Sequence, residues 1–515
     1  MLFDIIISSR IASISLFRWD SVPFCRHNMC YLCRQLRDQL KRGCLGARNM
    51  WIALAGTLMV IYNTLAPITG QYTPTWDSLD SRPLPTWYDE SKIGIFVHWG
   101  VFSVPALHGS NFWKFWHDSK PGDFYYEFMK KNYREDWTYA DFASQFTAEL
   151  FDPKQWADLF EDAGAKYVVL ITKHHEGFCN WNTNYSFNWN AMQVGPKRDL
   201  VAEVSKAVRG AGLHLGLYHS LYEWFNPLYL LDKGSGYRSQ LFVKGKTIPE
   251  LYELVNTYRP DLIWSDGNNE ASDDYFDSKE FLTWLYNDSP VKDQVVVNDR
   301  WGNTTNCKHG GYLTCDDRYN PKVLQARKWE NCDSVQKTAW GYRRDDDLRD
   351  YKPIHDIIST MAQTISCGGN YLLNVGPTHD GRILPIFEER LRQMGAWLKV
   401  NGEAIYASSP WRYQNDTVSG NVWYTKKKSN SSITGYSIYA FVLDWPLNNK
   451  LTLGAPIATP AIEITMLGYS QNGKNLQYDL RKNDLGIMVY FPYIPPNELP
   501  SFYAWVLKLD NVANV

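Results

Sequence analysis

The 515-residue sequence lacks several features that define common functional classes. Its formal net charge is −2 and no basic stretch lies in the main part of the chain, so we do not expect nucleic acid as a partner. No Gly-rich GxGxxG motif follows an apolar run, which argues against a dinucleotide-binding fold. No Cys-x-x-Cys pair occurs after Met50, so a thiolate zinc site is not expected, and we expect neither a metal nor a cofactor.

The N-terminal part has no apolar run long enough to span a bilayer comfortably. Residues 51–62 have the size of a signal-peptide core. They follow a basic extension, residues 1–49, that holds four of the nine cysteines. Secretory signals begin a protein, so we interpret Met50 as the start of translation, residues 50–70 as a signal peptide and the extension as untranslated. The alternative is an uncleaved anchor at residues 51–62, the one stable membrane contact that the sequence allows.

Entry into the secretory pathway predicts a lysosomal or secreted protein with glycans and disulfides. Cys307 and Cys315 are close enough for a small disulfide loop, and the odd number of cysteines after Met50 leaves at least one thiol free. The main sequons for N-glycosylation are at Asn184, Asn303, Asn415 and Asn430. A further sequon at Asn287 is weakened by Pro290.

The alternation of apolar runs and helical stretches predicts an α/β fold. Parallel strands joined by right-handed helical crossovers follow from this order, and the number of units favours a (β/α)8-like TIM barrel over an open sheet. After Val400, short alternating runs between turns predict a C-terminal antiparallel β-sandwich. We therefore expect a catalytic barrel over residues 71–406 and a structural sandwich over residues 407–515. The strand-like runs are 94–99, 167–172, 214–219, 262–266, 295–299 and 371–375, and the helical stretches are 153–163, 199–211, 249–258, 279–287, 354–366 and 385–400.

Polar and aromatic residues stand at the ends of five strand-like runs, and the carboxyl ends of barrel strands share one pocket. Asp266 ends a short apolar strand just before a glycine, which would hold a carboxylate rigidly; a helix cap is the alternative. Aromatic residues make up 15% of the chain and suit sugar faces, although ordinary core packing explains part of this content. The residues at the strand ends are His98, Trp99, His174, His175, Glu176, Tyr218, His219, Trp264, Asp266, Asp299, Arg300 and Trp301.

A carboxylate among histidines and aromatic residues suits glycosidic bond cleavage, which needs a nucleophile or base and a second carboxyl as acid. Asp266 suits the first role, with Arg300 or a histidine keeping it ionised. His174 and His175 should point to opposite sides of an extended chain, so we expect at most one to face a ligand. They support a metal-dependent hydrolase only weakly. Spacing leaves the second carboxyl open among Asp316, Asp317, Glu330 and Glu176.

Seven short motifs occur in a fixed order along the chain. They are W-Y-D-E (87–90), F-V-H-W-G (96–100), A-K-Y (165–167), K-H-H-E-G-F (173–178), W-S-D-G (264–267), N-D-R-W-G (298–302) and K-W-E-N-C (328–332). Together they resemble the retaining α-L-fucosidases of glycoside hydrolase family 29, from Trp87 to the C-terminus. The resemblance implies an exo-enzyme that releases terminal α-L-fucose from fucosylated glycans of glycoproteins, glycolipids and oligosaccharides. A homo-oligomer is compatible with it.

The resemblance also implies roles for individual residues. The nucleophile falls on Asp266 and the acid/base on Asp317, with Glu330 as runner-up and Asp316 third. Cys332 lies in a family motif and has been considered catalytic, but a two-carboxylate mechanism gives a thiol no obvious task, so we favour a structural role. The sugar-binding residues of the family fall on His98, His174, His175, Tyr218, Trp264 and Arg300.

Two positions depart from the family pattern. Asn111 and Phe112 occupy the places of a Glu-Trp pair that binds fucose hydroxyls. Asn111 still offers a hydrogen bond but no carboxylate, and Phe112 has no indole N–H. Asn268 and Asn269 stand where acidic and aromatic residues are frequent. A catalytically weakened fucose-binding protein of the same fold is therefore the alternative function.

Overall fold

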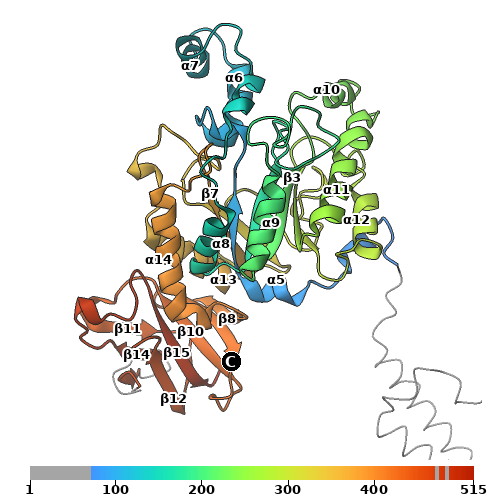
Figure 1. Cartoon of the computed structure of the whole chain (residues 1–515). Coiled ribbons are helices and arrows are strands. Elements are labelled where there is room, and N and C mark those ends of the chain that lie inside the picture. Colours follow the sequence, from blue (N-terminus) through green and yellow to red (C-terminus); the bar gives the residue numbers. More distant parts are fainter. Residues whose placement is uncertain (1–70, 470–474, 482–485) are drawn as a thin grey trace, which may run out of the picture. The chain divides into compact units, whose positions relative to one another are not determined.

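A curled sheet of seven parallel strands forms the centre of the chain, in the order β5–β4–β3–β2–β1–β7–β6 (Figure 1). The computed structural model describes residues 71–469, 475–481 and 486–515. The expected extension and signal peptide therefore lie outside the described residues. The strands are β1 (Ile93–Val97), β2 (Tyr167–Lys173), β3 (His214–Ser220), β4 (Leu262–Asp266), β5 (Val296–Val297), β6 (Trp329–Ser334) and β7 (Gly369–Val375).

Residues 311–313 close the sheet into a barrel between β5 and β6. The Gly311 N–H donates to the Val297 carbonyl at 3.0 Å, and the Leu313 N–H donates to the Lys328 carbonyl at 2.9 Å. The Glu330 N–H in turn donates to the Leu313 carbonyl at 2.8 Å. This short segment stands in the place of an eighth strand, so the predicted (β/α)8-like barrel is confirmed.

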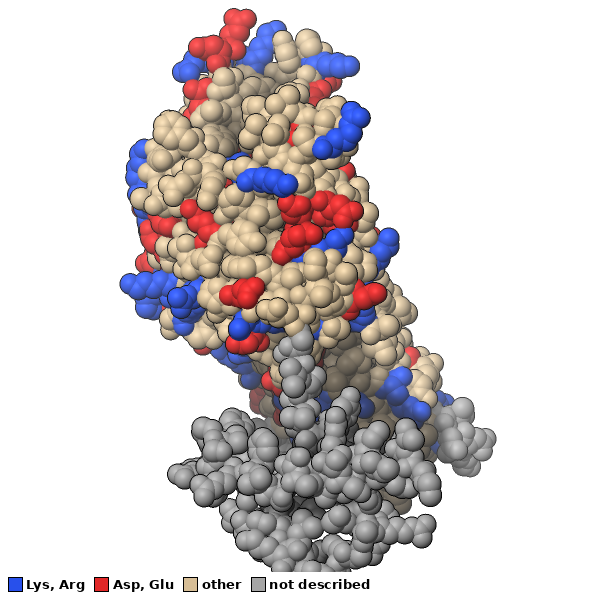
Figure 2. All heavy atoms as spheres, turned by 90° about the vertical axis from the view of Figure 1, so that its right-hand side faces the viewer, with Lys and Arg blue, Asp and Glu red and all other residues tan. Residues whose placement is uncertain are grey.

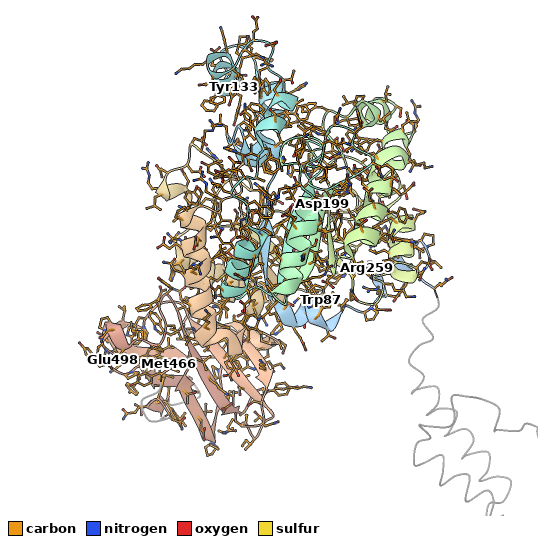
Figure 3. The ribbon with its side chains drawn as sticks, viewed as in Figure 1. Trp87, Tyr133, Asp199, Arg259, Met466 and Glu498 are labelled. Atoms are coloured by element: carbon orange, nitrogen blue, oxygen red, sulfur yellow. A yellow bond between two sulfur atoms is a disulfide. The ribbon has the colours of Figure 1, made fainter. Side chains whose placement is uncertain are left out.

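Helices cover the outer face of the sheet, and their first turns follow the sequence signals. Pro153 begins α8 and Pro385 begins α14. An N–H in the first turn of a helix has no acceptor within the helix, so proline, which lacks this N–H, costs no hydrogen bond there. Asp199 caps α9 by accepting the Ala202 N–H at 2.8 Å (Figure 3). No helix in the described part of the chain is long and apolar enough to cross a membrane. The barrel helices are α8 (Pro153–Asp162), α9 (Leu200–Gly210), α11 (Ile248–Tyr258), α12 (Ser278–Asn287), α13 (Ile354–Ser366) and α14 (Pro385–Asn401).

Strand β6 is the barrel strand that the sequence pattern does not predict. All six of its side chains are buried, and most of them are polar. Its Asn331 donates to Thr364 at 3.1 Å, and its Asp333 accepts a hydrogen bond from the Tyr371 hydroxyl at 2.9 Å. Hydrogen bonds to neighbouring elements replace the apolar contacts from which a strand is usually recognised.

Two antiparallel sheets form the C-terminal part, with strand orders β12–β15–β10–β9–β8 and β11–β14–β13. Their inner faces share one apolar cluster, which confirms the predicted β-sandwich. The Trp397 indole of α14 donates to the Ala504 carbonyl at 2.9 Å, so the sandwich is tied to a barrel helix. The boundary at residue 407 stays a prediction. The strands are β8 (Ser409–Asn415), β9 (Val422–Lys428), β10 (Tyr436–Val442), β11 (Lys450–Leu453), β12 (Ala458–Met466), β13 (Tyr478–Leu480), β14 (Ile487–Tyr490) and β15 (Trp505–Val512).

The surface shown in Figure 2 carries acidic and basic side chains interspersed among neutral ones. Among the described residues on this face, no continuous basic region is visible. A surface with both charges interspersed has no extended region of one sign that would attract polyanions or polycations over a long range.

The contact between α14 and the end of α8 gives a test of the helical layer. A Cβ added at Gly395 would collide with the Asp162 carbonyl oxygen. We expect Gly395→Ala to cost about 1–3 kcal/mol of unfolding free energy and to lower Tm in scanning calorimetry. Gly210→Ala is the matched control, because a Cβ at this last residue of α9 meets no atom within 4 Å. Equal Tm values for Gly395→Ala and the wild type would contradict this packing.

Candidate active site

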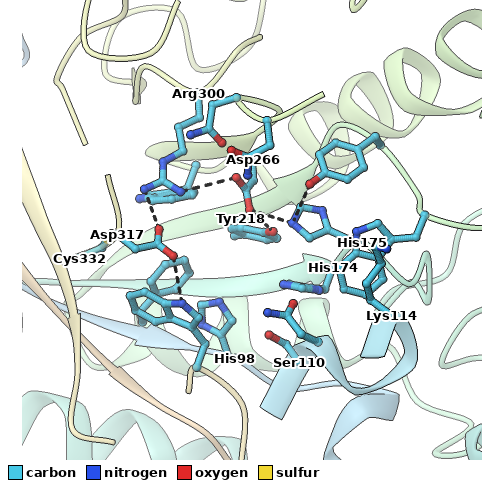
Figure 4. Close-up of a pocket in the computed structure, with 18 of the residues that line it drawn as sticks. His98, Ser110, Lys114, His174, His175, Tyr218, Asp266, Arg300, Asp317 and Cys332 are labelled. Atoms are coloured by element: carbon cyan, nitrogen blue, oxygen red, sulfur yellow. Dashed lines mark hydrogen bonds and ion pairs between the residues drawn. The ribbon is translucent and has the colours of Figure 1, made fainter. Parts of the chain in front are cut away.

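A pocket of about 590 Å³ opens at the carboxyl ends of the barrel strands (Figure 4). Histidines and aromatic rings form much of its wall, and three aspartates reach it. Because its residues come from elements far apart in sequence, the barrel is what brings them together. The predicted site residues that line it are His98, Asn111, His174, His175, Tyr218, Trp264, Asp266, Arg300, Asp316, Asp317 and Cys332.

Asp266 ends β4 and is held by three neighbouring groups. The Tyr218 hydroxyl donates to Oδ2 at 2.7 Å, and His175 Nε2 lies 3.3 Å from the same oxygen. Arg300 Nη1 lies 3.7 Å from Oδ1. Burial favours protonation, but His175, Arg300 and the Tyr218 hydroxyl outweigh it and hold the pKa of Asp266 well below its usual value. These contacts favour the ionised form of Asp266. The next helix, α12, begins only at Ser278, so Asp266 is not a helix cap.

Arg300 connects Asp266 to a second carboxylate, Asp317. Arg300 Nη2 donates to Asp317 Oδ1 at 2.8 Å, and the Trp340 indole N–H donates to the other oxygen at 3.2 Å. The guanidinium also lies 4.7 Å above the centre of the Trp264 ring. The side chain of Asp266 is 12% exposed and that of Asp317 is 48% exposed. One pocket thus presents a buried, ionised carboxylate and a second that is open to solvent.

The loop that carries Asp317 has its own support. Asp299, just beyond β5, accepts backbone N–H bonds from Cys307 at 2.7 Å, Thr314 at 2.9 Å and Cys315 at 3.1 Å. Cys307 and Cys315 form the predicted disulfide. The remaining cysteines of the described residues, Cys179, Cys332 and Cys367, are free thiols. The chain therefore reaches Asp316 and Asp317 from a loop closed by both a covalent bond and a buried carboxylate.

Glu330 lies behind the pocket wall and does not line it. Its Oε2 accepts the hydroxyls of Tyr88 at 2.9 Å and Tyr167 at 2.6 Å, and its Oε1 accepts the Trp264 indole N–H at 3.0 Å. Burial raises its pKa. Both oxygens are occupied by neighbouring side chains, so Glu330 orients the Trp264 ring and has no open face toward a ligand.

Two other candidates differ in their access to the pocket. Cys332 on β6 lines it, but the side chain is buried and burial raises the pKa of the thiol, which disfavours a thiolate nucleophile. Glu176 stands behind His174, whose Nδ1 lies 3.4 Å from Glu176 Oε2. Burial raises the pKa of Glu176 to about 8.

Both His174 and His175 line the pocket, so the expectation that they point to opposite sides is wrong. β2 ends at Lys173, and the chain then turns, with the Gly177 N–H donating to the His174 carbonyl at 3.0 Å. Gly177 has a φ of 84°, which favours glycine. The two imidazole centres lie 4.4 Å apart. Alternation of side chains applies to extended strands and ends where the turn begins.

Burial favours the neutral form of two of the histidines. His98 Nδ1 lies 2.6 Å from Asn374 Oδ1, and its ring stacks on Trp340 at 5.3 Å. Burial lowers the pKa of His98 to about 4 and the pKa of His174 well below its usual value. Neutral imidazoles exchange hydrogen bonds with hydroxyl groups and add no positive charge beside Arg300. In the described part of the chain, no three His, Cys, Asp or Glu side chains are grouped to hold a metal ion.

The two departures from the family pattern have different positions. Asn111 ends the short helix η5 (Gly109–Asn111) and lines the pocket, whereas Phe112 is fully buried in the core. Asn268 and Asn269 also line the pocket. Sequence reasoning missed seven lining residues, of which Trp224 could have been found because it follows β3 closely. The seven are Phe96, Ser110, Lys114, Phe115, Tyr222, Trp224 and Trp340.

Comparison with known proteins agrees with this geometry. The family model described as alpha-L-fucosidase matches residues 59–403, and the one described as alpha-L-fucosidase C-terminal domain matches residues 414–510. The alpha-L-fucosidase of Branchiostoma floridae is 53% identical, covering 89% of this chain and all of that protein. The tissue alpha-L-fucosidase of Homo sapiens is 54% identical, covering 86% of this chain and 92% of that protein.

A solved structure shows the same fold. The alpha-fucosidase of Thermotoga maritima, crystallised in complex with fucose, superimposes with a TM-score of 0.71 and 32% identity, over 85% of this chain and all of that one. The match covers both the barrel and the C-terminal part. The chain therefore belongs to the alpha-L-fucosidase family, glycoside hydrolase family 29.

Proposed function

We propose that the protein is a retaining exo-α-L-fucosidase that hydrolyses terminal α-L-fucose from glycoproteins, glycolipids and oligosaccharides. The pairing of Asp266 and Asp317 through Arg300 is the observation that carries the proposal. A double displacement needs one carboxylate that stays ionised and a second carboxyl that exchanges a proton with a leaving group or water. The buried Asp266 meets the first requirement and the open Asp317 meets the second.

The proposed reaction has two steps. In the first, Asp266 attacks the anomeric carbon while Asp317 protonates the departing glycosidic oxygen, which leaves a fucosyl-enzyme ester. In the second, Asp317 takes a proton from water, and the water oxygen attacks the anomeric carbon and releases Asp266. Two inversions return the original anomeric configuration. His98, His174, His175, Tyr218, Trp264, Arg300 and Asn111 are proposed to bind the sugar.

The alternative, a fucose-binding protein with weakened catalysis, is not favoured. Its motivation was the loss of a carboxylate and an indole at Asn111 and Phe112. Asn111 still presents an amide to the pocket. The reacting groups Asp266, Arg300 and Asp317 are intact and in contact.

We also propose that the protein enters the secretory pathway, as a lysosomal or secreted enzyme. The Cys307–Cys315 disulfide and the human tissue relative support this proposal. Asn184, Asn303 and Asn430 are exposed and accessible to a glycan, whereas the Asn415 amide donates to two backbone carbonyls. N-terminal sequencing of secreted protein should begin between residues 66 and 71, and glycopeptides should carry Asn184, Asn303 or Asn430. A product that begins at Met1 and has no glycan would contradict both expectations.

The two carboxylates are tested by substitution. Wild-type protein should release 4-nitrophenol from the aryl α-L-fucoside, and Asp266→Gly should reduce kcat/KM by about 10³-fold or more, because no covalent intermediate forms. Asp317→Ala should lose about 10²–10⁴-fold, and azide should restore turnover by replacing water in the second step. The matched control is Glu330→Ala, which azide should not rescue. Full activity of Asp266→Gly, or azide rescue of Glu330→Ala alone, would overturn the assignment.

The hydroxyl of Tyr218 predicts a change in pH dependence. Its hydrogen bond lowers the pKa of Asp266, so catalysis that needs the ionised carboxylate survives at acid pH and is lost as the pH falls through that pKa. In Tyr218→Phe this pKa rises, and the acid-side midpoint of kcat/KM should move to higher pH. Tyr222→Phe is the control, since that hydroxyl contacts His175 at 3.4 Å and makes no hydrogen bond to Asp266. Coinciding acid limbs of Tyr218→Phe and the wild type would contradict the role of Tyr218.

A further inference from the structure

Two buried polar atoms face each other in the pocket wall without other partners. His174 Nδ1 and Glu176 Oε2 are 3.4 Å apart, and both side chains are almost fully buried. Neither atom has a hydrogen-bond partner elsewhere among the described residues. A buried polar atom without a partner costs free energy, so this pair must share a proton if both are to be satisfied. His174 Nδ1 is the acceptor if the proton belongs to Glu176, and the donor if it belongs to the histidine.

The turn after β2 holds this pair in place. The hydrogen bond between the Gly177 N–H and the His174 carbonyl folds the chain so that Glu176 comes back against the histidine ring. The Trp189 indole N–H donates to the Glu176 carbonyl at 3.1 Å and fixes the backbone of the turn. A side chain at position 177 would collide with Glu223. The backbone of the turn therefore places Glu176 and His174 side by side.

We propose that Glu176 is a positioning residue: in its protonated form it donates a hydrogen bond to His174 Nδ1 and fixes the tautomer whose Nε2–H is a donor toward the pocket. The inference rests on the proposed function, because it assigns the direction of a hydrogen bond to the bound sugar. The tautomer of a neutral histidine is set by the bond that its other nitrogen makes. His174 lines the pocket and its Nδ1 is turned away from it, so Nε2 is the nitrogen available to a sugar hydroxyl oxygen.

The surroundings of Glu176 favour the proton on the carboxyl. Burial raises its pKa to about 8, and the nearby Glu223 adds to this effect. Its own backbone N–H and Lys173 act in the opposite direction. Lys173 Nζ is itself paired with Glu250 at 2.7 Å and Glu223 at 3.0 Å, so its charge is already balanced. The titratable groups that face Glu176 from the surrounding elements are Tyr139, Lys173, His174, Tyr218 and Glu223.

Loss of the Glu176 proton changes what His174 offers to the sugar. An ionised carboxylate accepts a hydrogen bond and donates none, so His174 must carry its proton on Nδ1. Nε2 then becomes an acceptor, and the donor toward the pocket is lost. We therefore expect sugar binding to weaken as the pH rises through the pKa of Glu176.

The test compares Glu176→Gln with the wild type across pH. Glutamine donates to Nδ1 at every pH and cannot ionise. The substrate is 2-chloro-4-nitrophenyl α-L-fucoside, whose leaving group needs no protonation, so loss of the Asp317 proton does not limit the first step. For the wild type, kcat/KM should fall above about pH 8 and level off about tenfold lower, as expected for the loss of one sugar hydrogen bond. For Glu176→Gln, the midpoint of the alkaline fall in kcat/KM should move up by about one pH unit or more, or the fall should disappear.

Two further variants separate positioning from packing. Glu176→Met fills the space without a donor, and its KM should rise about tenfold with a smaller change in kcat, as expected for the loss of one sugar hydrogen bond. The matched control is Glu223→Gln, a neighbouring buried carboxyl that does not contact His174, and this variant should keep an alkaline limb. Calorimetric titration with L-fucose measures the same effect without turnover. Its Kd should rise above about pH 8 in the wild type and not in Glu176→Gln.

The outcomes are distinct for the two proposals. If Glu176→Gln and the wild type share the same alkaline midpoint in both turnover and fucose binding, Glu176 does not set the tautomer. If fucose binding shows the expected pH dependence and the wild type has no turnover, the proposed function fails while the role of Glu176 stands. Thermal melts show whether each variant is folded. If Glu176→Met is unfolded, the comparison of Glu176→Gln with the wild type decides whether Glu176 sets the tautomer.

Discussion

The guanidinium of Arg300 is the group on which the geometry of the pocket depends. It contacts Asp266 on one side and Asp317 on the other, and it lies over the Trp264 ring. One cation thus adds to the effect of His175 and Tyr218 on the pKa of Asp266, binds the second carboxylate, and lies against an aromatic wall. The planar fork of arginine suits this double contact better than a lysine would.

The barrel supports this group through layers that do not touch the sugar. Glu330 holds the indole of Trp264 from behind, and Asp299 gathers the backbone of the loop that carries Asp317. Both carboxylates are fully buried and hydrogen-bonded, so they act on the pocket through the side chains and the loop that they hold. Glu176 acts similarly on His174. Trp264, the loop before Asp317 and His174 are thus each in contact with a buried carboxyl group behind the pocket wall.

Most of the fold could be predicted from the sequence, because apolar runs and helix-start signals report local structure. Six of the seven barrel strands follow apolar runs, and the prolines at 153 and 385 begin helices as expected. Strand β6 could not be found in this way, since its residues are buried by polar contacts. The closing segment 311–313 is also too short to produce a periodic pattern.

For the site, the strand-end rule and the family motifs identified the residues of the pocket but not their orientation. The sequence left Asp317 and Glu330 both open, because the distance of each from the pocket is a tertiary property. His174 and His175 were misjudged for the same reason: a turn that depends on Gly177 follows the strand directly. Trp340 was missed because it follows the strand that was not predicted.

The loop closed by Cys307 and Cys315 has a consequence for the chemistry of the enzyme. Asp266, the proposed nucleophile, is fixed to a barrel strand, whereas Asp317, the proposed acid, lies two residues beyond a covalently closed loop. Reduction of that bond would loosen the segment before Asp317 and leave Asp266 in place. The leaving group of a natural glycoside needs a proton, whereas that of an activated aryl fucoside does not. Under reducing conditions, hydrolysis of natural glycosides would therefore slow more than hydrolysis of activated aryl fucosides. The oxidising state of a compartment would then set which substrates the enzyme can cleave, and not only how long it survives.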